Sequence, residues 1–479
     1  MNRRTLVLAL PAMLLAGCAS IGQMPPRADI VLPDTFVFAP AEGAADTVDV
    51  AVLLPTKTLA FQALMKRAVD APDLNIALAR IDAARAVTKR AKAERLPSVD
   101  YNASTQEQRS NPSQFGSPPG GAGIDASRFS IGGEIGASWD LDLFGRLKAS
   151  QRAAQKRVDA AGFDAEAVRI ALTSEVAAAV VDWQSLAAQQ AQVMANVTAA
   201  EERTSLIKSR VRAGLNPGLD AMRSDAVVEG LRSQLAPLNG EEAQIVSRMV
   251  ALTGAPADAV IADLNLSRPQ LASSQWDGGD APTSAPSALI AARPDVQAAA
   301  ARLAASDADL TATAAQRFPR FTLSSALGLL SFSLGGLFDS DAITGQLGAG
   351  IAGPLLDFGR IQSEIDGSKA QTQIAFEELR KTTFTALGEA EGSFGRLAAA
   401  DREAALLSAQ ATREADVARV SASRYRAGLE SLIAVLDADR TAYQARQQAV
   451  AANGRAQRAR LTLWQSLGGP GVNALFAAK

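Results

Sequence analysis

The sequence contains no histidine and a single cysteine, Cys18, among its 479 residues. These absences exclude disulfides within the chain, metal sites built on thiolate or imidazole ligands, and Ser-His-Asp catalysis. Carboxylates remain the one route to an enzyme, and the sequence places none of them in a pocket-like context. We therefore expect no enzyme activity, no catalytic residue and no metal site.

Aromatic residues and long uncharged runs are also scarce. Aromatics make up 5% of the chain, and together with abundant Ala, Arg, Glu and Gln this favours long helices over compact cores. After Cys18 no uncharged run is long enough for a membrane helix, so any crossing must be made by strands. Without residues 1–17 the chain carries 46 basic and 50 acidic residues, a balance of −4 that gives no sign of nucleic-acid binding.

The N-terminus has the pattern of a secretory signal. "MNRRTLVLALPAMLLAGC" combines two arginines, an apolar run and small residues before Cys18. "LLAGC" resembles a bacterial lipoprotein cleavage box, which implies that residues 1–17 are removed as a signal peptide and that Cys18 carries the lipid, including palmitate. In such lipoproteins Ala19, in place of Asp, implies sorting to the outer membrane. The alternative is an ordinary cysteine near a cleaved signal. No cofactor other than the N-terminal lipid is expected.

A long alternation of apolar and polar residues runs through "RFSIGGEIGASWDLDLFGR", residues 128–146. In a strand, alternate side chains point to opposite faces, so one face of this strand meets an apolar environment and the other meets water. Strands of soluble sandwiches usually run about five or six residues, whereas about ten are needed to cross a bilayer as a tilted barrel strand. The stretch therefore predicts a transmembrane β-barrel strand.

The chain is built from two copies of one unit. Four motifs recur in the same order: residues 72–97 match 294–319, "LFGR" ending at Arg146 matches "DFGR" ending at Arg360, "RAGL" at 212–215 matches 426–429, and "LDAMR" at 219–223 matches "LDADR" at 436–440. Each copy carries a hairpin of two alternating strands, and four strands are too few to close a barrel. Three copies of the chain would supply twelve and close it.

Long helices follow each "FGR". About 67 residues without proline, from Arg146 to Arg212, would span on the order of 100 Å. A heptad seam through this segment predicts left-handed supercoiling against a neighbour. The glycine of "RAGL" ends the helix and the chain turns back. A soluble coiled-coil rod is the alternative, but a rod would need neither the strands nor the lipid.

These patterns predict a mainly α fold with a membrane β-barrel. The second half begins after residue 280, and residues 468–479 form a C-terminal tail. The predicted segments are a signal peptide at 1–17, a lipidated N-terminal segment with a first short helix at 18–71, repeat 1 at 72–280 with strands at 98–107 and 128–142 and helices at 146–213 and 217–253, and repeat 2 at 281–467 with strands at 319–331 and 342–353 and helices at 360–427 and 430–467.

The lipobox, the repeated unit and three longer motifs resemble the TolC-type outer-membrane factors, also called outer-membrane efflux proteins. The motifs are "RPDVQAAAARLAASDADLTATAAQRFPRFTLS" at 293–324, "GPLLDFGRI" at 353–361 and "YRAGLESLIAVLDADR" at 425–440. The likeness is to the NodT-like or OprM-like lipoprotein branch and covers nearly all of the mature chain. It implies a homotrimer whose 12-stranded barrel crosses the outer membrane of a Gram-negative bacterium and continues as a periplasmic α-helical tunnel.

The resemblance also implies a function and partners. Such a protein is the channel, or exit duct, of a tripartite efflux transporter that passes small molecules such as drugs or metal ions to the outside, as in multidrug resistance. The implied partners are two further copies of the chain, a periplasmic adaptor (membrane fusion protein), an inner-membrane pump of the RND type, and outer-membrane lipid.

In this family the periplasmic tips of the helical hairpins close the tunnel through polar contacts near the glycine turns. Three copies of Asp437 would form an acidic ring able to attract cations. Arg426 would hold the closed state by pairing with a carboxylate such as Asp220. At Ala434 this chain lacks a carboxylate that some relatives carry. Carried over from the family's motif, the gate and selectivity candidates are Tyr425, Arg426, Glu430, Asp437, Asp220 and Arg212, with hairpin turns at Gly214 and Gly428.

Other interpretations remain for the sequence. In the simplest alternative, each charged residue at the tips lies on a solvent-exposed helix face and plays no part in gating. A lipid-anchored periplasmic coiled-coil adaptor or scaffold would use the helices without a pore. A trimeric adhesin-type autotransporter also pools four strands per chain, but its strands are contiguous at the C-terminus, whereas these hairpins lie over 200 residues apart. "GAGIAG" at 348–353 fits a dinucleotide-binding pattern, but Pro354 and the coil that follows are a poor start for that fold.

Overall fold

A computed structural model describes residues 27, 29–39, 53–109, 127–267 and 286–476. The predicted signal peptide and Cys18 lie outside the described residues. The chain divides into two compact units, which we call the sheet unit and the helical unit. The sheet unit comprises Met1–Ala28, Asp82–Ala160 and Ala300–Glu378, and the helical unit comprises Asp29–Ile81, Ala161–Ala299 and Leu379–Lys479.

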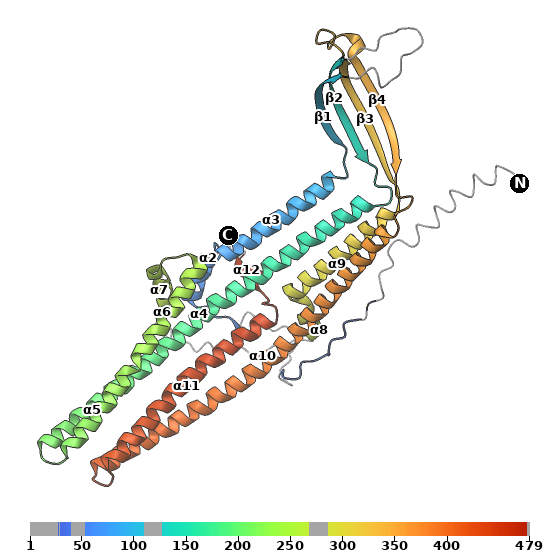
Figure 1. Cartoon of the computed structure of the whole chain (residues 1–479). Coiled ribbons are helices and arrows are strands. Elements are labelled where there is room, and N and C mark those ends of the chain that lie inside the picture. The colour runs from blue at the N-terminus through green and yellow to red at the C-terminus, as the bar shows by residue number, and fades with distance from the viewer. Residues whose placement is uncertain (1–26, 28, 40–52, 110–126, 268–285, 477–479) are drawn as a thin grey trace, which may run out of the picture. The chain divides into compact units, whose positions relative to one another are not determined.

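The sheet unit holds one antiparallel sheet whose strands lie side by side in chain order (Figure 1). Its central pairing joins the two repeats, with Ile135 opposite Leu327, and each outer strand pairs with its own hairpin partner. Four antiparallel strands, two from each repeat, were expected from the alternating patterns. Their bounds are β1 Ser98–Arg109, β2 Ser127–Asp140, β3 Arg320–Ser331 and β4 Ile343–Ala352.

The two faces of the sheet differ in chemistry, as the alternation predicts. Tyr101, Ile135 and Leu327 follow one another across the sheet on one face, and each is more than 60% exposed. The opposite face is polar, with Asn102, Glu134 and Gln346 among Ser, Thr and Gly positions, and at Gly328 an added Cβ would lie 2.8 Å from the Cα of Glu134. A close approach of this kind needs glycine at position 328.

Two helices of 67 residues each, α4 (Arg146–Arg212) and α10 (Arg360–Arg426), follow the strands of their repeats and contribute to both units. Each begins at an aspartate that accepts hydrogen bonds from backbone N–H groups. Asp142 accepts from Leu147 and Lys148 at 2.8 Å, and Asp357 accepts from Ile361 at 3.0 Å. These carboxylates satisfy donors that the first helical turn leaves free.

The return path differs between the repeats. In the second repeat α11 (Leu432–Ser466) is one helix of 35 residues. In the first, the single helix expected over 217–253 is instead two helices, α5 (Gly218–Ser233) and α6 (Leu235–Thr253), with Gln234 between them. Pro237 gives the reason, because it has no N–H for the carbonyl of Ser233 and its ring crowds that carbonyl.

Shorter helices complete the chain. The first short helix expected within 18–71 is α2, and the segments matching 72–97 and 294–319 form α3 and α9. Their bounds, with those of helices that the sequence patterns did not predict, are α2 Leu59–Ala68, α3 Pro72–Ala93, α7 Ala257–Asn265, α8 Pro286–Ala292, α9 Pro294–Ala314 and α12 Val472–Phe476, with 3₁₀ turns η5 Ala315–Arg317 and η6 Ser340–Ala342.

The core of the helical unit gathers around two fully buried tryptophans, Trp183 of α4 and Trp464 of α11. The heptad seam predicted on α4 is buried at Leu172, Val176 and Ile207 among others. On α11 the alanines at 442, 445, 449, 452 and 456 are buried. Alanine at the contact positions lets helices approach closely.

By length and apolar content, no described helix taken singly is able to span a membrane. The segments Gly218–Thr253 and Ala257–Asn265 meet those criteria only as a pair, which is bent by 111°.

Candidate gate at the hairpin tips

The two long helices end at the same kind of turn. Gly214 and Gly428 both have φ of 73°, and nothing described lies within 4 Å of a Cβ built on either. Leu215 N–H donates to the Arg210 carbonyl and Leu429 N–H donates to the Arg424 carbonyl, both at 2.9 Å. This pattern is the Schellman motif, in which glycine takes the left-handed position without strain. The turns therefore lie where the sequence analysis placed them.

The start of each return helix corrects the alignment of the repeats. Pro217 and Ser431 are the N-caps of α5 and α11, and each follows its turn glycine at the same spacing. The register set by the turn glycines thus continues into the return helices, which makes Asp220 the equivalent of Ala434. The match of "LDAMR" with "LDADR" implies a different register and is wrong, because helix starts and not side-chain likeness set the alignment.

Asn216 joins the first tip to the second. Its Nδ2 donates to Asp220 Oδ2 at 2.9 Å and to the Tyr425 hydroxyl at 3.1 Å, while its Oδ1 accepts from Arg210 Nε at 2.9 Å. The Arg210 guanidinium also lies 5.1 Å from the centre of the Tyr425 ring, within the range of a cation–π contact. Asp220 and Tyr425, both candidates from the sequence, are brought together through an asparagine that the sequence analysis missed.

The arginine candidates contact their own helices. Arg426 donates to the carbonyl of Ala422 at 3.3 Å and to Ser423 Oγ at 3.2 Å. Arg212 donates in the same way to Ser209 Oγ at 3.0 Å. Within the described part of one chain Arg426 forms no ion pair with Asp220, and pairing between chains stays a prediction. Asp220 is occupied by Asn216 from its own hairpin instead.

The acidic candidates on the second tip have local partners. Glu430 lies 3.4 Å from Arg424, across the glycine turn. Asp437 pairs with Arg440 one helical turn later at 2.5 Å, and both side chains are more than 60% exposed. An exposed i,i+3 pair of this kind adds little stability.

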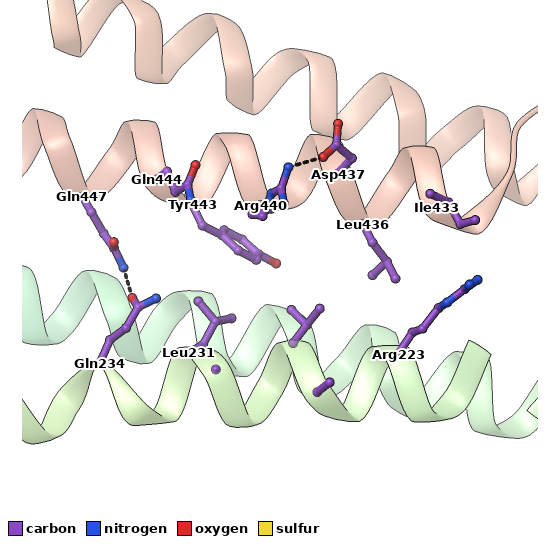
Figure 2. Close-up of a pocket in the computed structure, with 13 residues that line it drawn as sticks. Arg223, Leu231, Gln234, Ile433, Leu436, Asp437, Arg440, Tyr443, Gln444 and Gln447 are labelled. Atoms are coloured by element: carbon purple, nitrogen blue, oxygen red, sulfur yellow. Dashed lines mark hydrogen bonds and ion pairs between the residues drawn. The ribbon is translucent and has the colours of Figure 1, made fainter. Parts of the chain in front are cut away.

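A groove of about 590 Å³ runs between α5 and α11 above the tips (Figure 2). Its floor is largely apolar: Leu231 of α5 lies opposite Tyr443 of α11, and Leu436 projects from α11 further along the groove. Arg223, Asp437 and Arg440 stand along its rim, and at one end Gln447 Nε2 donates to Gln234 Oε1 at 2.6 Å. The groove joins an apolar floor to a charged rim.

Across the residues that the structure describes, no three Asp, Glu or Cys side chains cluster in a way that would hold a metal ion.

Comparison with known proteins identifies the family of the chain. The family model described as outer membrane efflux protein matches residues 66–255 and 285–469, one match for each repeat. The chain belongs to this family. This outer membrane efflux protein is 28% identical over 477 residues to the pyoverdine export outer membrane protein OpmQ of Pseudomonas aeruginosa, covering 98% of this chain and 97% of the relative.

Two further likenesses agree with the assignment. The chain is 30% identical over 405 residues to SepC of Pseudomonas putida, a probable efflux pump outer membrane protein, covering 83% of this chain and 80% of the relative. A crystal structure of a membrane protein from Pseudomonas aeruginosa superposes with a TM-score of 0.80 at 26% identity, covering 94% of this chain and all of that one. The predicted family, the mainly helical repeated fold and the predicted class of function, an outer-membrane efflux component, are confirmed.

Proposed function

We propose that three copies of this outer membrane efflux protein form a channel that carries small molecules out of the cell. The observation that carries the proposal is the sheet, with one exposed apolar face, one polar face, and β1 and β4 as its two outer strands. Four strands are too few to close, whereas twelve from three chains make a barrel with an apolar outside and a polar lumen. The long helices continue the duct into the periplasm.

The partners of such a duct are a periplasmic adaptor and an inner-membrane pump, of the RND type. The groove between α5 and α11 suits an adaptor helix, because an apolar floor binds an apolar stripe and the rim arginines, Arg223 and Arg440, attract acidic side chains. Relatives are named for pyoverdine export and for efflux pumps. We accordingly take the cargo to be small organic molecules such as drugs, with metal ions as a second class.

The tips form the gate of this duct. Asn216 and Tyr425 hold the two hairpins of each chain together at the turns, and three copies of Asp437 form an acidic ring that attracts cations. Lipid on Cys18 anchors the chain to the outer membrane. No covalent step is involved, and the duct works by opening and closing.

The test is single-channel conductance of the detergent-purified protein in planar bilayers. We expect small, cation-selective events for the natural sequence. Tyr425→Phe removes one hydrogen bond, on the order of 1 kcal/mol, so open events should become a few-fold more frequent. Tyr101→Phe, which removes a hydroxyl from the exposed face of the sheet, is the matched control and should change nothing.

Asp437→Asn extends the same experiment to selectivity. We expect its events to lose cation preference while their frequency stays close to that of the natural sequence. A protein that stays in solution without detergent and never inserts would instead be the lipid-anchored adaptor or scaffold, and the channel proposal would be wrong.

A further inference from the structure

A buried ion pair links the two hairpins above the gate. Arg203 of α4 lies in the first hairpin and Asp439 of α11 in the second, and Arg203 Nη1 is 2.6 Å from Asp439 Oδ2. The Asp439 side chain is 8% exposed and that of Arg203 is 23% exposed. We call this pair the inter-hairpin clamp.

The clamp lies at one level on both hairpins. Arg203 precedes Gly214 by the same number of positions as Asp439 follows Gly428. At about 1.5 Å per residue, each is about 16 Å along its helix from the turn. The clamp and the Asn216–Tyr425 bond therefore join the same two hairpins at two heights, the clamp above and the gate contact below.

The surroundings of the clamp are closed. α4 contributes Arg203 and Thr204, α5 contributes the uncharged Ser224 and Val227, and α11 contributes Leu436, Asp439 and Tyr443 around a small cavity. Arg446, one turn beyond Tyr443, adds the other nearby charge. Burial raises the pKa of the Asp439 carboxyl in spite of Arg203 and Arg446, and burial together with the Asp439 charge raises the pKa of Tyr443 to about 12.

This clamp therefore adds little to stability. When burial raises the folded-state pKa of an aspartate above its unfolded value, the contribution of that group to stability is present at low pH and is lost as the pH rises through the folded-state pKa. Buried ion pairs are best attested as devices that fix register between packed elements. The clamp has the position for that role.

The repeat supplies a matched site. In the register that Gly214 and Gly428 set, Asp225 of α5 is the equivalent of Asp439. Asp225 pairs with Lys208 of α4 at 2.7 Å, within its own hairpin, and both side chains are about half exposed. Of two equivalent carboxylates, one is buried and crosses between hairpins, and the other is exposed and stays within one hairpin.

We propose that Arg203 and Asp439 are positioning residues for the gate, which hold the two hairpins in register so that Asn216 and Tyr425 meet. This inference rests on the proposed channel function. Loss of the Asp439 carboxyl leaves the Arg203 guanidinium without its partner on the second hairpin. The two hairpins then lose their register and the gate opens more readily.

Acid should not release the clamp. A protonated Asp439 keeps a carbonyl oxygen that accepts a hydrogen bond from Arg203, and the closed site holds this proton more tightly than an open site in which the carboxyl meets water. Through Asp439, lowering the pH therefore favours the closed gate. The frequency of open events should fall as the pH is lowered through the raised folded-state pKa of Asp439.

The experiment compares Asp439→Ala with Asp225→Ala in planar bilayers, using the full-length protein in detergent. Asp439→Ala should raise the frequency of open events by about tenfold or more at pH 7, because removing one partner of a buried ion pair leaves the Arg203 charge uncompensated. It should also lack the fall in frequency at low pH. Asp225→Ala should behave as the natural sequence at every pH, and Asp439→Asn, which keeps an acceptor for Arg203, should restore closure.

A covalent bridge distinguishes positioning from a general loss of structure. The double variant Arg203→Cys with Asp439→Cys should open as readily as Asp439→Ala. A bismaleimide with a reducible spacer, placed across the two cysteines, should return it to the closed baseline, and reductant should open it again. Each single cysteine variant treated with the same reagent is the control.

Two outcomes overturn the clamp. In the first, Asp439→Ala and Asp225→Ala show the same frequency of open events and the same dependence of that frequency on pH, and both variants melt at the same temperature. The other is cross-linked protein that stays open. Either leaves the channel proposal intact, because the natural sequence still conducts, whereas absence of events from the natural sequence contradicts the channel itself.

Discussion

The two hairpins share their outgoing helix and their turn but differ in the way back. α4 and α10 have 67 residues each and end at glycines with the same φ of 73°. On the return, α11 is continuous, whereas α5 and α6 are interrupted at Gln234. The long outgoing helix therefore sets both the length of each repeat and the position of its turn. The return helix is then free to vary with its local packing.

Equivalent glycines show how far that packing diverges. Gly240 of α6 and Gly454 of α11 occupy the same place in the two repeats, in the register of the turn glycines. A Cβ added to Gly240 would meet nothing within 4 Å, whereas one added to Gly454 would lie 2.9 Å from the Cβ of Ser185 on α4. The second return helix is therefore pressed against the first hairpin at a point where the first return helix is open.

The largest expected effect comes from copying the interruption of the first hairpin into the second. Ala451 is the equivalent of Pro237, and Ala451→Pro would remove a backbone hydrogen bond from the interior of α11 and crowd the carbonyl of Gln447. We expect a loss of about 3 kcal/mol or more in the free energy of unfolding. Thermal unfolding in detergent, followed by far-UV circular dichroism, measures it. Pro237→Ala is the reciprocal control and should not destabilise, and equal melting of Ala451→Pro and the natural sequence would contradict the comparison.

The glycine pair gives an intermediate effect of opposite sign in the two repeats. Gly454→Ala forces Ser185 to move, and overpacking of this kind costs about 1–3 kcal/mol. Gly240→Ala has room and should stabilise α6 by about 0.5–1 kcal/mol, because alanine loses less backbone freedom on folding. Chemical denaturation of both variants under the same conditions measures the two changes in the free energy of unfolding. Changes of the same sign would contradict this prediction.

The N-caps give the smallest expected effect. The Ser431 side chain accepts a hydrogen bond from Ala434 N–H at 3.3 Å, whereas its equivalent Pro217 has no side-chain acceptor. Ser431→Ala should cost about 1 kcal/mol, and Pro217→Ala should cost less because no cap is lost. Hydrogen exchange of the backbone amides in the first turn of α11, measured by mass spectrometry, should be faster in Ser431→Ala. Unchanged exchange there would show that the cap does not stabilise the start of α11.

The periodic features of the fold were predictable from the sequence, because they repeat along the chain and need no knowledge of partners. Alternation gave the four strands, the heptad seam gave the buried line through Trp183, and glycine marked both turns. The interruption at Gln234 was not predicted, because proline is tolerated in the first turn of a new helix as readily as it breaks an old one.

The side-chain pairings of the site were less predictable. Tyr425 and Asp220 were found through a family motif, but Asn216, which joins them, and Arg203, which crosses to Asp439, lie outside that motif. Their partners are set by how the hairpins pack together. Within one chain Arg426 does not pair with Asp220 for the same reason, since opposite charge does not fix which groups meet.

The ladder between β2 and β3 bears on the order in which the protein folds. Ile135 and Leu327, which face each other across it, are separated in the chain by the whole of the first helical hairpin. Closing so long a segment costs conformational entropy before any pairing compensates for it, and non-local strand pairing is slow for that reason. The helical hairpins form from contacts that are nearer in sequence. We therefore expect each chain to acquire its helices first and its sheet last, after the second repeat has been translated and its strands are delivered to those of the first.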